Sequence, residues 1–285
     1  MELLQLKYFC DAAQTENFSL TARKFRVPTS NISQTIKRLE QELGTELFSR
    51  RKNHIYLNEQ GRIFYQGVKG ALDRLEDTRL QLQDAGREVT GEIRILALTN
   101  RRIITKTVRR FRESYPAVSF VLSHSHTAKE SEFDIIIADS DHHAEGFRGR
   151  ELLVEDILLA LWPEHPLAGE ANIRLSRLQN ERFITMSAGS SFRAITDDVC
   201  REAGFVPKIA IETDDPYYVR RYVEMGMGVA FVPSLTWKGQ ISEGIVLKEL
   251  HTARRTTCIF LPEDRYLTRP MKLFADMLEE TAKTY

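Results

Sequence analysis

The feature that most constrains this chain is the stretch from residue 18 to residue 61, in which two short helical patterns flank a tight turn. Leu20, Ala22 and Phe25 mark the inward side of the first pattern. Pro28 cannot continue that helix but suits the start of the next one. Because Ala22 is small, the two helix backbones can approach closely. The stretch therefore predicts a helix-turn-helix, a motif that places its second helix in the major groove of DNA.

The second helix of this motif has an apolar stripe and a polar stripe. The apolar side chains recur at i, i+4, i+7 and i+11 and therefore face the core. They are Ile32, Ile36, Leu39 and Leu43. We expect Thr29 or Ser30 to cap this helix and Gly44 to end it. On the opposite stripe, short polar side chains can reach base edges, whereas Lys37 and Arg38 suit phosphates.

The charge of the whole chain is balanced, with 40 basic and 40 acidic side chains, so DNA binding requires local segregation of charge. Basic residues gather between residues 20 and 54, where only Glu40, Glu42 and Glu46 oppose them. Mixed charges usually mark a solvated helical face, but here they surround a helix-turn-helix pattern. Residues 51–57 alternate like a short basic hairpin, or wing, that can follow the DNA backbone. The predicted DNA contacts are Arg23, Thr29, Ser30, Asn31, Ser33, Gln34, Thr35, Lys37, Arg38, Arg50, Arg51 and Lys52.

This head strongly resembles the DNA-binding head of the LysR-type transcriptional regulators. The resemblance is carried by Phe9, Phe18, Ala22, Val27, Ser30, Ile32, Ser33, Ile36, Leu39, Glu40, Leu43, Gly44, Leu47, Phe48, Arg50, Leu57 and Gly61. Thr21, Phe25, Gln34 and Asn58 depart from the pattern and stand where the family usually has Ala, Leu, Arg and Thr. Because Gln34 is an expected DNA contact, its change bears on the operator sequence rather than on binding itself.

Residues 59–86 predict one long helix whose apolar side chains form a narrow seam close to a heptad repeat. A helix that is apolar on a single stripe must bury that stripe, and we expect the partner to be a second copy of the chain. Packing of the seam against the same chain is the less favoured alternative. In the resembling family the corresponding helix dimerises the protein. The predicted dimerisation residues are Phe64, Val68, Leu72, Leu75 and Leu82.

After Gly91 strands and helices alternate, which predicts an α/β domain with a parallel sheet. Strands are expected at residues 93–98, 118–123, 133–138, 157–162, 183–184, 208–212, 229–232, 245–250 and 256–261, and helices at 101–115, 191–203, 216–225 and 267–283. The family resemblance implies a two-lobed effector domain like the periplasmic binding proteins. The predicted boundaries are 1–58 for the winged head, 59–90 for the linker helix and 91–285 for the effector domain, with lobe I at about 91–162 and 263–285 and lobe II at about 163–262.

One connection in lobe I is shorter than the family pattern. Between the strands at 118–123 and 133–138 the family normally has a helix, but residues 123–132 are too few for a strand-helix-strand unit. Lobe I is therefore expected to be trimmed along one wall of the cleft between the lobes. The ligand pocket would then be shallower, differently shaped or lost.

Small ligands of such sheets bind at the carboxyl ends of strands, near helix N-termini whose N–H groups attract anions. Two segments qualify, residues 99–100 after the first strand and residues 187–191 before a helix. Simple helix capping explains these side chains about equally well. Together with the family resemblance, the predicted effector contacts are Thr99, Asn100, Thr127, Ser187, Gly189, Ser190, Ser191 and Phe231. No cofactor is expected.

Two further interpretations of single residues are less favoured. A metal site could include His124, His126, His142 and His143 with Asp134, Asp139 and Asp141, but no ligand motif is present. Cys200 could be a redox switch, but a lone helical cysteine is more often a core residue. The three cysteines are widely spaced without a C-x-x-C, which indicates a reduced, intracellular protein. No signal peptide and no apolar run of ~20 residues is present, so we expect a cytoplasmic protein without a membrane partner.

Two classes of function follow from these patterns. The favoured interpretation is a sequence-specific, LysR-type transcriptional regulator of a bacterium, which binds double-stranded DNA as a homodimer or homotetramer. Its activity would respond to a small-molecule effector in the inter-lobe cleft. The alternative is a small-molecule enzyme or a solute-binding protein with an incidental helical head. The chain contains no G-x-S-x-G, P-loop or H-E-x-x-H motif, so we expect no enzymatic activity.

Overall fold

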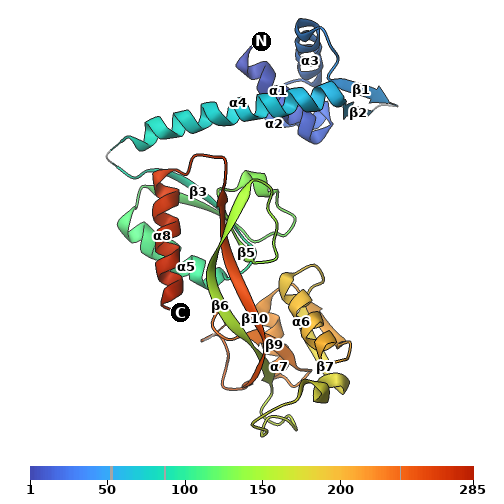
Figure 1. Ribbon diagram of the computed structural model, residues 1–285, viewed down its shortest axis with the longest axis vertical. Coiled ribbons are helices and arrows are strands. Elements are labelled where there is room, and N and C mark those ends of the chain that lie inside the picture. Colours follow the sequence, from blue (N-terminus) through green and yellow to red (C-terminus); the bar gives the residue numbers. More distant parts are fainter. Residues whose placement is uncertain (52–53, 87, 238) are drawn as a thin grey trace. The chain divides into compact units, whose positions relative to one another are not determined.

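The computed structural model describes residues 1–51, 54–86, 88–237 and 239–285. The chain forms two compact units, Met1–Gly86 and Arg87–Tyr285 (Figure 1). The described part of the first unit consists of α1 (Leu3–Thr15), α2 (Phe18–Phe25), α3 (Thr29–Leu43), β1 (Phe48–Arg51), β2 (His54–Leu57) and α4 (Glu59–Asp84). Helices α1, α2 and α3 pack around a core in which Phe9, Ile32 and Leu39 are fully buried.

The turn between α2 and α3 is built by Arg26, whose backbone lies in the left-handed region with a φ of 54°. The Val27 N–H donates to the Ala22 carbonyl at 3.0 Å. Helix α3 begins directly after Pro28, which offers no side-chain cap, so the expected cap by a serine or threonine is wrong. Because the pyrrolidine ring of Pro28 already fixes a φ suited to the start of a helix, α3 can begin without a side-chain cap. Gly44 ends α3 as predicted, with a φ of 69°.

One residue of α2 lies differently from the prediction. Leu20 is exposed, and the core-facing side of α2 is formed by Phe18, Thr21, Ala22 and Phe25. These positions repeat at i, i+3, i+4 and i+7, which is the spacing of one helical face. Leu20 falls outside that face, and Thr21 takes the buried position beside Ala22.

Hydrogen bonds fix the hairpin and the start of α4 against α3. The Glu40 carboxylate accepts from two successive N–H groups of the segment entering β1, at 2.8 and 3.2 Å. Asn58 caps α4 by accepting from the Gly61 N–H at 2.7 Å, and its amide donates to the Glu46 carbonyl at 2.7 Å. A Cβ atom on Gly61 would lie 2.2 Å from the Leu47 carbonyl oxygen. The close approach of α4 to this segment therefore requires glycine.

The first turns of α4 pack against α1 of the same unit. The ring of Phe64 lies 5.1 Å from that of an α1 phenylalanine, and Val68 is buried. For these two residues the less favoured alternative, packing within the chain, is what the structure shows, because α1 lies alongside this half of α4. Leu72 is half-buried, whereas Leu75 and Leu82 are 58% and 74% exposed. The exposed part of the predicted seam therefore begins after Val68.

The C-terminal unit is built on a six-stranded sheet with the order β4-β3-β5-β10-β6-β9. The strands are β3 (Gly91–Ala97), β4 (Val118–Ser123), β5 (Ile135–Asp139), β6 (Phe147–Leu161), β9 (Ala230–Pro233) and β10 (Val246–Pro262). Strand β3 is parallel to β4 and β5, but β10 is antiparallel to β5 and β6. The expected parallel sheet is therefore wrong for this part, because β10 brings the chain back alongside β6.

Strands β6 and β10 are each longer than predicted. The two strands expected at 245–250 and 256–261 form one strand, with a register shift between Glu249 and Arg254. Such an irregularity lets a strand bend without ending. In Figure 1 the yellow-green β6 and the orange-red β10 run side by side through both halves of the unit. The two halves therefore share one continuous pair of strands.

Each half has its own hydrophobic core. In lobe I, α5 (Arg101–Ser114) and α8 (Arg269–Lys283) pack on the sheet over Ile93 and Ile95, and Phe111 of α5 lies in the same core. Lobe II contains η2 (Leu175–Asn180), the parallel pair β7 (Arg182–Met186) and β8 (Lys208–Thr213), and the helices α6 (Ser191–Glu202) and α7 (Pro216–Glu224). A bridge between Phe183 and Val229 joins β7 to the segment before β9.

The connection from β4 to β5 is short, as predicted. Within residues 124–134, all of which are described, it contains the three-residue 3-10 helix η1 (Glu130–Glu132) and no α-helix. Successive residues of a strand face opposite sides of a sheet. Leu96 and Ile136 therefore lie on the face opposite the α5 and α8 core, in a small buried cluster with Cys258 and Phe260. Loops rather than a helix cover this cluster.

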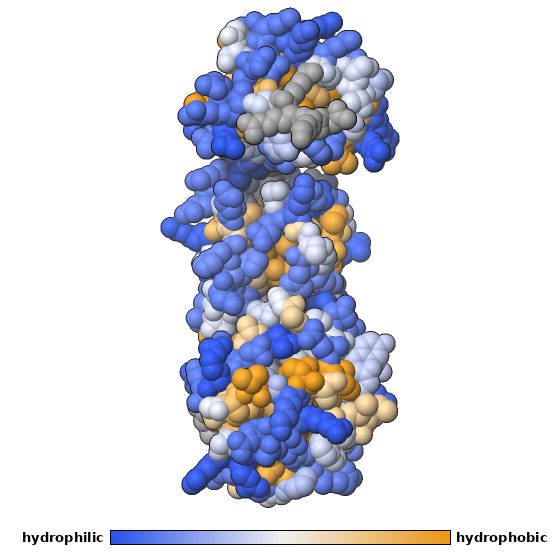
Figure 2. Space-filling model, turned by 90° about the vertical axis from the view of Figure 1, so that its right-hand side faces the viewer, coloured by the Kyte–Doolittle hydropathy of each residue, from blue (hydrophilic) through white to orange (hydrophobic). Residues whose placement is uncertain are grey.

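The surface is mainly hydrophilic on the face shown in Figure 2, and its apolar residues form separate patches. Exposed large apolar side chains include Leu75 and Leu82 on α4 and Tyr217, Met225 and Met227 around α7. Within the described residues, no helix combines the length and hydropathy that are needed to cross a membrane.

Candidate functional site

The polar stripe of α3 carries most of the predicted DNA contacts. The apolar stripe is buried in the head, so the opposite stripe faces solvent. Its exposed side chains are Thr29, Ser30, Asn31, Gln34, Lys37 and Arg38, with Ser33 and Thr35 half-buried at its edge and Arg23 exposed on α2. Because no side chain caps α3, the N–H groups of its first turn can meet an anion such as a phosphate.

The hairpin carries further basic residues of the predicted DNA contacts. Strands β1 and β2 pair antiparallel, with Phe48 opposite Leu57 and Arg51 opposite His54. Arg50 and Arg51 lie on β1, whereas Lys52 lies outside the described residues. Glu40 is an acidic residue of the head, and its carboxylate accepts hydrogen bonds from the segment entering β1. Its negative charge is therefore bound within the fold.

A second candidate site is a cavity of about 410 Å³ between the two lobes. Lobe I contributes Leu98, His126, Ala138, Asp139, Asp141, His142 and His143, and lobe II contributes Ala188, Gly189, Ser190, Ser191, Arg193, Ala194 and Asp197. The predicted effector contacts Gly189, Ser190 and Ser191 are thus on its wall. Ser190 caps α6, and its hydroxyl accepts from the Arg193 N–H at 3.1 Å.

Other predicted effector contacts lie away from this cavity. The ring of Phe231 is buried in the lobe II core, 5.6 Å from that of Phe183, so its assignment to the cleft is wrong. Thr127 is exposed, and its hydroxyl lies 2.9 Å from that of Ser125. The short connection explains this position, because no helix carries Thr127 toward lobe II. Ser187 is half-buried next to the cavity wall without lining it.

Thr99 and Asn100 are buried at the start of α5 rather than on the cavity wall. Asn100 has a φ of 54° and does not cap α5 with its side chain. Its amide instead donates to the hydroxyl of Thr257 on β10. The Thr99 hydroxyl and the Asn100 side-chain oxygen are buried without a hydrogen-bond partner among the described residues. The predicted anion site at α5 is therefore turned toward the interior of lobe I.

A buried ionic network joins the lobes beside this cavity. Asp139, the last residue of β5, accepts hydrogen bonds from the Ser191 hydroxyl of α6 and from the Arg255 guanidinium of β10, the latter at 2.9 Å. Arg255 also lies 3.8 Å from the carboxylate of Glu155 on β6. Glu155 in turn accepts from the Thr236 N–H at 2.9 Å and from its hydroxyl at 3.0 Å. Both carboxylates and the guanidinium are buried.

Sequence reasoning missed this network as a unit. Asp139 was weighed only as a neighbour of the histidines, and Arg255 and Glu155 drew no functional prediction. One signal was available for the two carboxylates, since charged residues are rarely fully buried without a partner. Asp139 directly follows the apolar run 135–138, and Glu155 interrupts the largely apolar segment 152–161. That signal does not say which residues pair, because the partners come from three strands and one helix.

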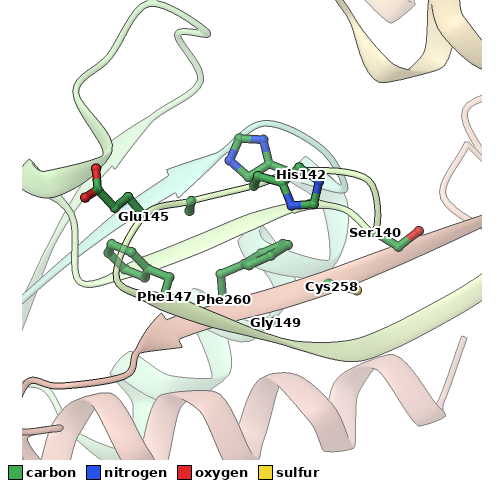
Figure 3. Close-up of a pocket in the computed structure, with 9 residues that line it drawn as sticks. Ser140, His142, Glu145, Phe147, Gly149, Cys258 and Phe260 are labelled. Atoms are coloured by element: carbon green, nitrogen blue, oxygen red, sulfur yellow. The ribbon is translucent and has the colours of Figure 1, made fainter.

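The histidines border two hollows without forming a metal site. His142 lies 2.9 Å from the Glu130 carboxylate and meets the Phe260 ring edge-on at 5.5 Å. Figure 3 shows it above Phe260 in a second cavity of about 500 Å³, with Phe147 and Cys258 also on its lining. In the described parts of the chain, no three His, Cys, Asp or Glu side chains are grouped so that they could hold a metal ion.

The cysteines are protected rather than reactive. Burial, with a smaller contribution from the charge of Asp197, raises the pKa of the Cys200 thiol to about 12. Burial likewise raises the pKa of Cys10 to about 11. A reactive cysteine needs the thiolate form, which these environments disfavour. The structure therefore gives the interpretation of Cys200 as a redox switch no support.

Two family models match the chain. Residues 3–62 match the bacterial regulatory helix-turn-helix protein, lysR family, and residues 86–283 match the LysR substrate binding domain. The first match covers α1 to the start of α4, and the second covers nearly all of the C-terminal unit. Both candidate sites therefore lie within matched regions.

Individual relatives match over most of their length. The chain is 31% identical to the HTH-type transcriptional regulator ShiR of Corynebacterium glutamicum (strain R), over 81% of this chain and 82% of ShiR. It is 28% identical to the transcriptional dual regulator GltC of Bacillus subtilis (strain 168), over 94% of this chain and 93% of GltC. A full-length OxyR variant from Pseudomonas aeruginosa has a TM-score of 0.71 at 19% identity, covering 99% of this chain and 95% of that one, which shows a shared fold.

Proposed function

The chain belongs to the LysR family of bacterial transcriptional regulators, and we propose that it recognises its operator through the polar stripe of α3 and the β1–β2 wing. As a member of this family it is a DNA-binding regulator with an effector-binding domain, not an enzyme. The single observation that carries the proposal is the division of α3 into a buried apolar stripe and an exposed polar one. The functional boundaries follow as 1–58 for the winged head, 59–90 for the linker helix and 91–285 for the effector domain.

Within the head, each set of side chains has a distinct role. Asn31, Ser33, Gln34 and Thr35 face base edges, together with Thr29 and Ser30 at the start of the helix. Lys37 and Arg38 contact phosphates, as do Arg23 and the basic residues of the wing. Short polar side chains distinguish bases, whereas basic ones bind the backbone of any sequence. Because the charge of the whole chain is zero, this local stripe supplies the attraction to DNA.

A second copy of the chain covers the exposed part of α4. A hollow of about 590 Å³ runs along this helix and is lined by Gly67, Gly70, Ala71, Arg74, Leu75 and Thr78. Small residues let another helix approach closely, and Leu72, Leu75 and Leu82 supply the apolar contact. A dimer places two heads on successive half-sites, and pairing of dimers gives a tetramer. Such a regulator acts in the cytoplasm, where the bacterial chromosome lies.

The inter-lobe cavity is the effector site in this proposal. It is supported by walls from both lobes and by Gly189, Ser190 and Ser191 at the N-terminus of α6. The short β4–β5 connection trims one wall, so the cavity differs in shape from one that a helix would complete. A ligand that binds one arrangement of the lobes better than another would shift their equilibrium, and hence the spacing of the heads.

A gel-shift assay with genomic fragments selected by the full-length protein tests the DNA-binding proposal. We expect a discrete, sequence-specific complex whose affinity falls steeply with salt concentration, because phosphate contacts release counterions. Fragments that were not selected serve as the competitor. Failure to select any sequence, or binding that ignores sequence, would overturn the assignment of α3 as the recognition helix.

A further inference from the structure

The N-terminus of α6 is an expected place for an acidic ligand, and it is already occupied by the protein. Ser191 is the first residue of this helix, and its hydroxyl donates to the carboxylate of Asp139 from the other lobe. An organic acid in the cavity would use this same donor and the same helix terminus. Asp139 is 5% exposed, so its carboxylate is part of the interior.

The second oxygen of that carboxylate is bound as well. Arg255 donates its Nε–H to Asp139 at 2.9 Å, and its guanidinium lies over the Phe192 ring with the central carbon 5.3 Å from the centroid. The arginine is 7% exposed. It is therefore held by a strand on one side and by α6 on the other, in a position that serves Asp139 rather than solvent.

The charges around the cavity do not favour a further anion. The buried network has two carboxylates, Asp139 and Glu155, for one guanidinium. Asp141 and Asp197 add negative charge to the cavity wall. Arg193, the arginine on that wall, already contacts Asp197 at 3.0 Å and Glu212 at 2.7 Å. Of the three histidines that also line the wall, His142 lies 2.9 Å from the Glu130 carboxylate. These carboxylates repel an acidic ligand, which lowers the affinity of the cavity for an anion unless a cation lies between the charges.

We propose that Asp139 is the specificity-determining residue of the inter-lobe cavity, where its carboxylate takes the place of an acidic ligand and excludes organic acids. The inference rests on the proposed role of this cavity as the effector site. It follows that effectors of this regulator are neutral or basic molecules. It also follows that removing the carboxylate converts the position into a site for a small acid.

Chemical rescue of the full-length protein tests this proposal. Asp139→Ala leaves a space of about the size of a carboxylate between Ser191 and Arg255, and formate has the size of the missing group. We expect the melting temperature of Asp139→Ala to fall by roughly 5–15 °C, because a buried guanidinium loses its partner. Sodium formate at ~100 mM should then raise it by several degrees through binding to the folded state.

Matched controls separate binding from general salt effects. Formamide has the shape of formate without its charge, and sodium chloride matches its ionic strength; neither should stabilise Asp139→Ala beyond its effect on the parent. Asp139→Asn keeps the volume filled and should show no formate-specific shift. The parent should not respond to formate either, so its affinity should be at least about tenfold weaker than that of Asp139→Ala. A formate-specific shift of the parent equal to that of Asp139→Ala, or none in Asp139→Ala, would overturn the proposal.

If Asp139→Ala does not fold, calorimetric titration of the parent with benzoate decides the question. We expect no binding at ~1 mM, a concentration at which a site with even modest affinity would be occupied. Benzoate binding that Ser191→Ala abolishes would show that an acid reaches α6 despite Asp139, and the proposal would be wrong. Neither measurement involves DNA, so failure here leaves the regulator assignment intact, and failure of the gel shift leaves the formate result intact.

Discussion

Helices α3 and α6 begin at the two candidate sites and use their N-termini in opposite ways. Helix α3 follows Pro28, has no side-chain cap and presents a polar stripe to solvent. Helix α6 is capped by Ser190, and its first residue, Ser191, binds the carboxylate of Asp139 from the other lobe. Both N-termini attract negative charge. In the proposed complex with DNA the first meets an anion from outside the chain, whereas the second already meets an anion from within it.

The difference has a physical reason. DNA carries phosphates at high density, so in the proposed complex an uncapped helix start gains a partner on binding. The two lobes need a contact that holds them together when no ligand is bound. The buried carboxylate of Asp139, which accepts a hydrogen bond from each of two elements, provides that contact. The price of such a contact is dependence on each of its charged members, because a buried charge without a partner is strongly unfavourable.

Removal of Arg255, the cation of the buried network at the start of α6, should have the largest effect on that site. Arg255→Ala leaves Asp139 and Glu155 buried without a guanidinium, and we expect the unfolding free energy of the C-terminal unit to fall by about 3–5 kcal/mol. Urea denaturation followed by circular dichroism measures this loss. The neighbouring Arg254→Ala is the matched control, because Arg254 pairs with Asp156 on the surface at 3.1 Å, and its removal should cost ~1 kcal/mol or less. Equal losses would contradict the role given to the network.

The DNA-binding head that carries α3 depends instead on the close approach of α4 to the segment that enters β1. Gly61→Ala places a Cβ atom 2.2 Å from the Leu47 carbonyl oxygen, and the rigid backbone cannot yield cheaply. We expect the N-terminal unit to lose about 3 kcal/mol, with loss of DNA binding, while the C-terminal unit is unaffected. At concentrations at which the chain is monomeric, Gly67→Ala, with nothing within 4 Å in its own chain, should instead stabilise the unit by roughly 0.5–1 kcal/mol. Denaturation of both variants distinguishes a packing limit from a general preference for glycine in α4.

Single side chains on the open stripe should have smaller and distinct effects. Lys37→Ala should weaken binding to all sequences by about tenfold and reduce the slope of the salt dependence by ~0.9, because one phosphate contact is lost. Ser33→Ala should change the preferred sequence more than the salt dependence. Lys129→Ala, an exposed lysine of the C-terminal unit, is the control. Parent-like binding by both head variants would mean that another element reads the DNA.

The smallest expected effect concerns the cap of α4. Asn58→Thr restores the residue that the family usually has, and a threonine hydroxyl can still accept from the Gly61 N–H. It cannot reproduce the amide contact with the Glu46 carbonyl at 2.7 Å. We expect a loss of roughly 0.5–1 kcal/mol in the N-terminal unit, measured by urea denaturation, and about 1 kcal/mol or more for Asn58→Ala, which loses both contacts. A variant Asn58→Thr as stable as the parent would show that the second contact contributes nothing.

Much of the head could be predicted because its signals are local. The apolar stripe of α3 and the Gly44 terminus both depend on residues that lie close together in the sequence. Leu20 was misplaced because a helix of two turns leaves the inward face ambiguous by one position. The boundaries of the long strands were missed for a different reason. A strand that changes register, as β10 does between Glu249 and Arg254, interrupts the pattern without ending the pairing.

The amino-acid sequence by itself determined the helix-turn-helix, the polar stripe of α3, the long α4 and the short connection from β4 to β5. Only the tertiary structure decided that Phe64 and Val68 serve the core of their own unit, and that the start of α6 is filled from within. Asp139 meets Ser191 across 52 positions of sequence and Arg255 across 116. Helical periodicity relates residues three or four apart, so it defines the exposed face of α3, whereas contacts over such separations exist only once both lobes have folded.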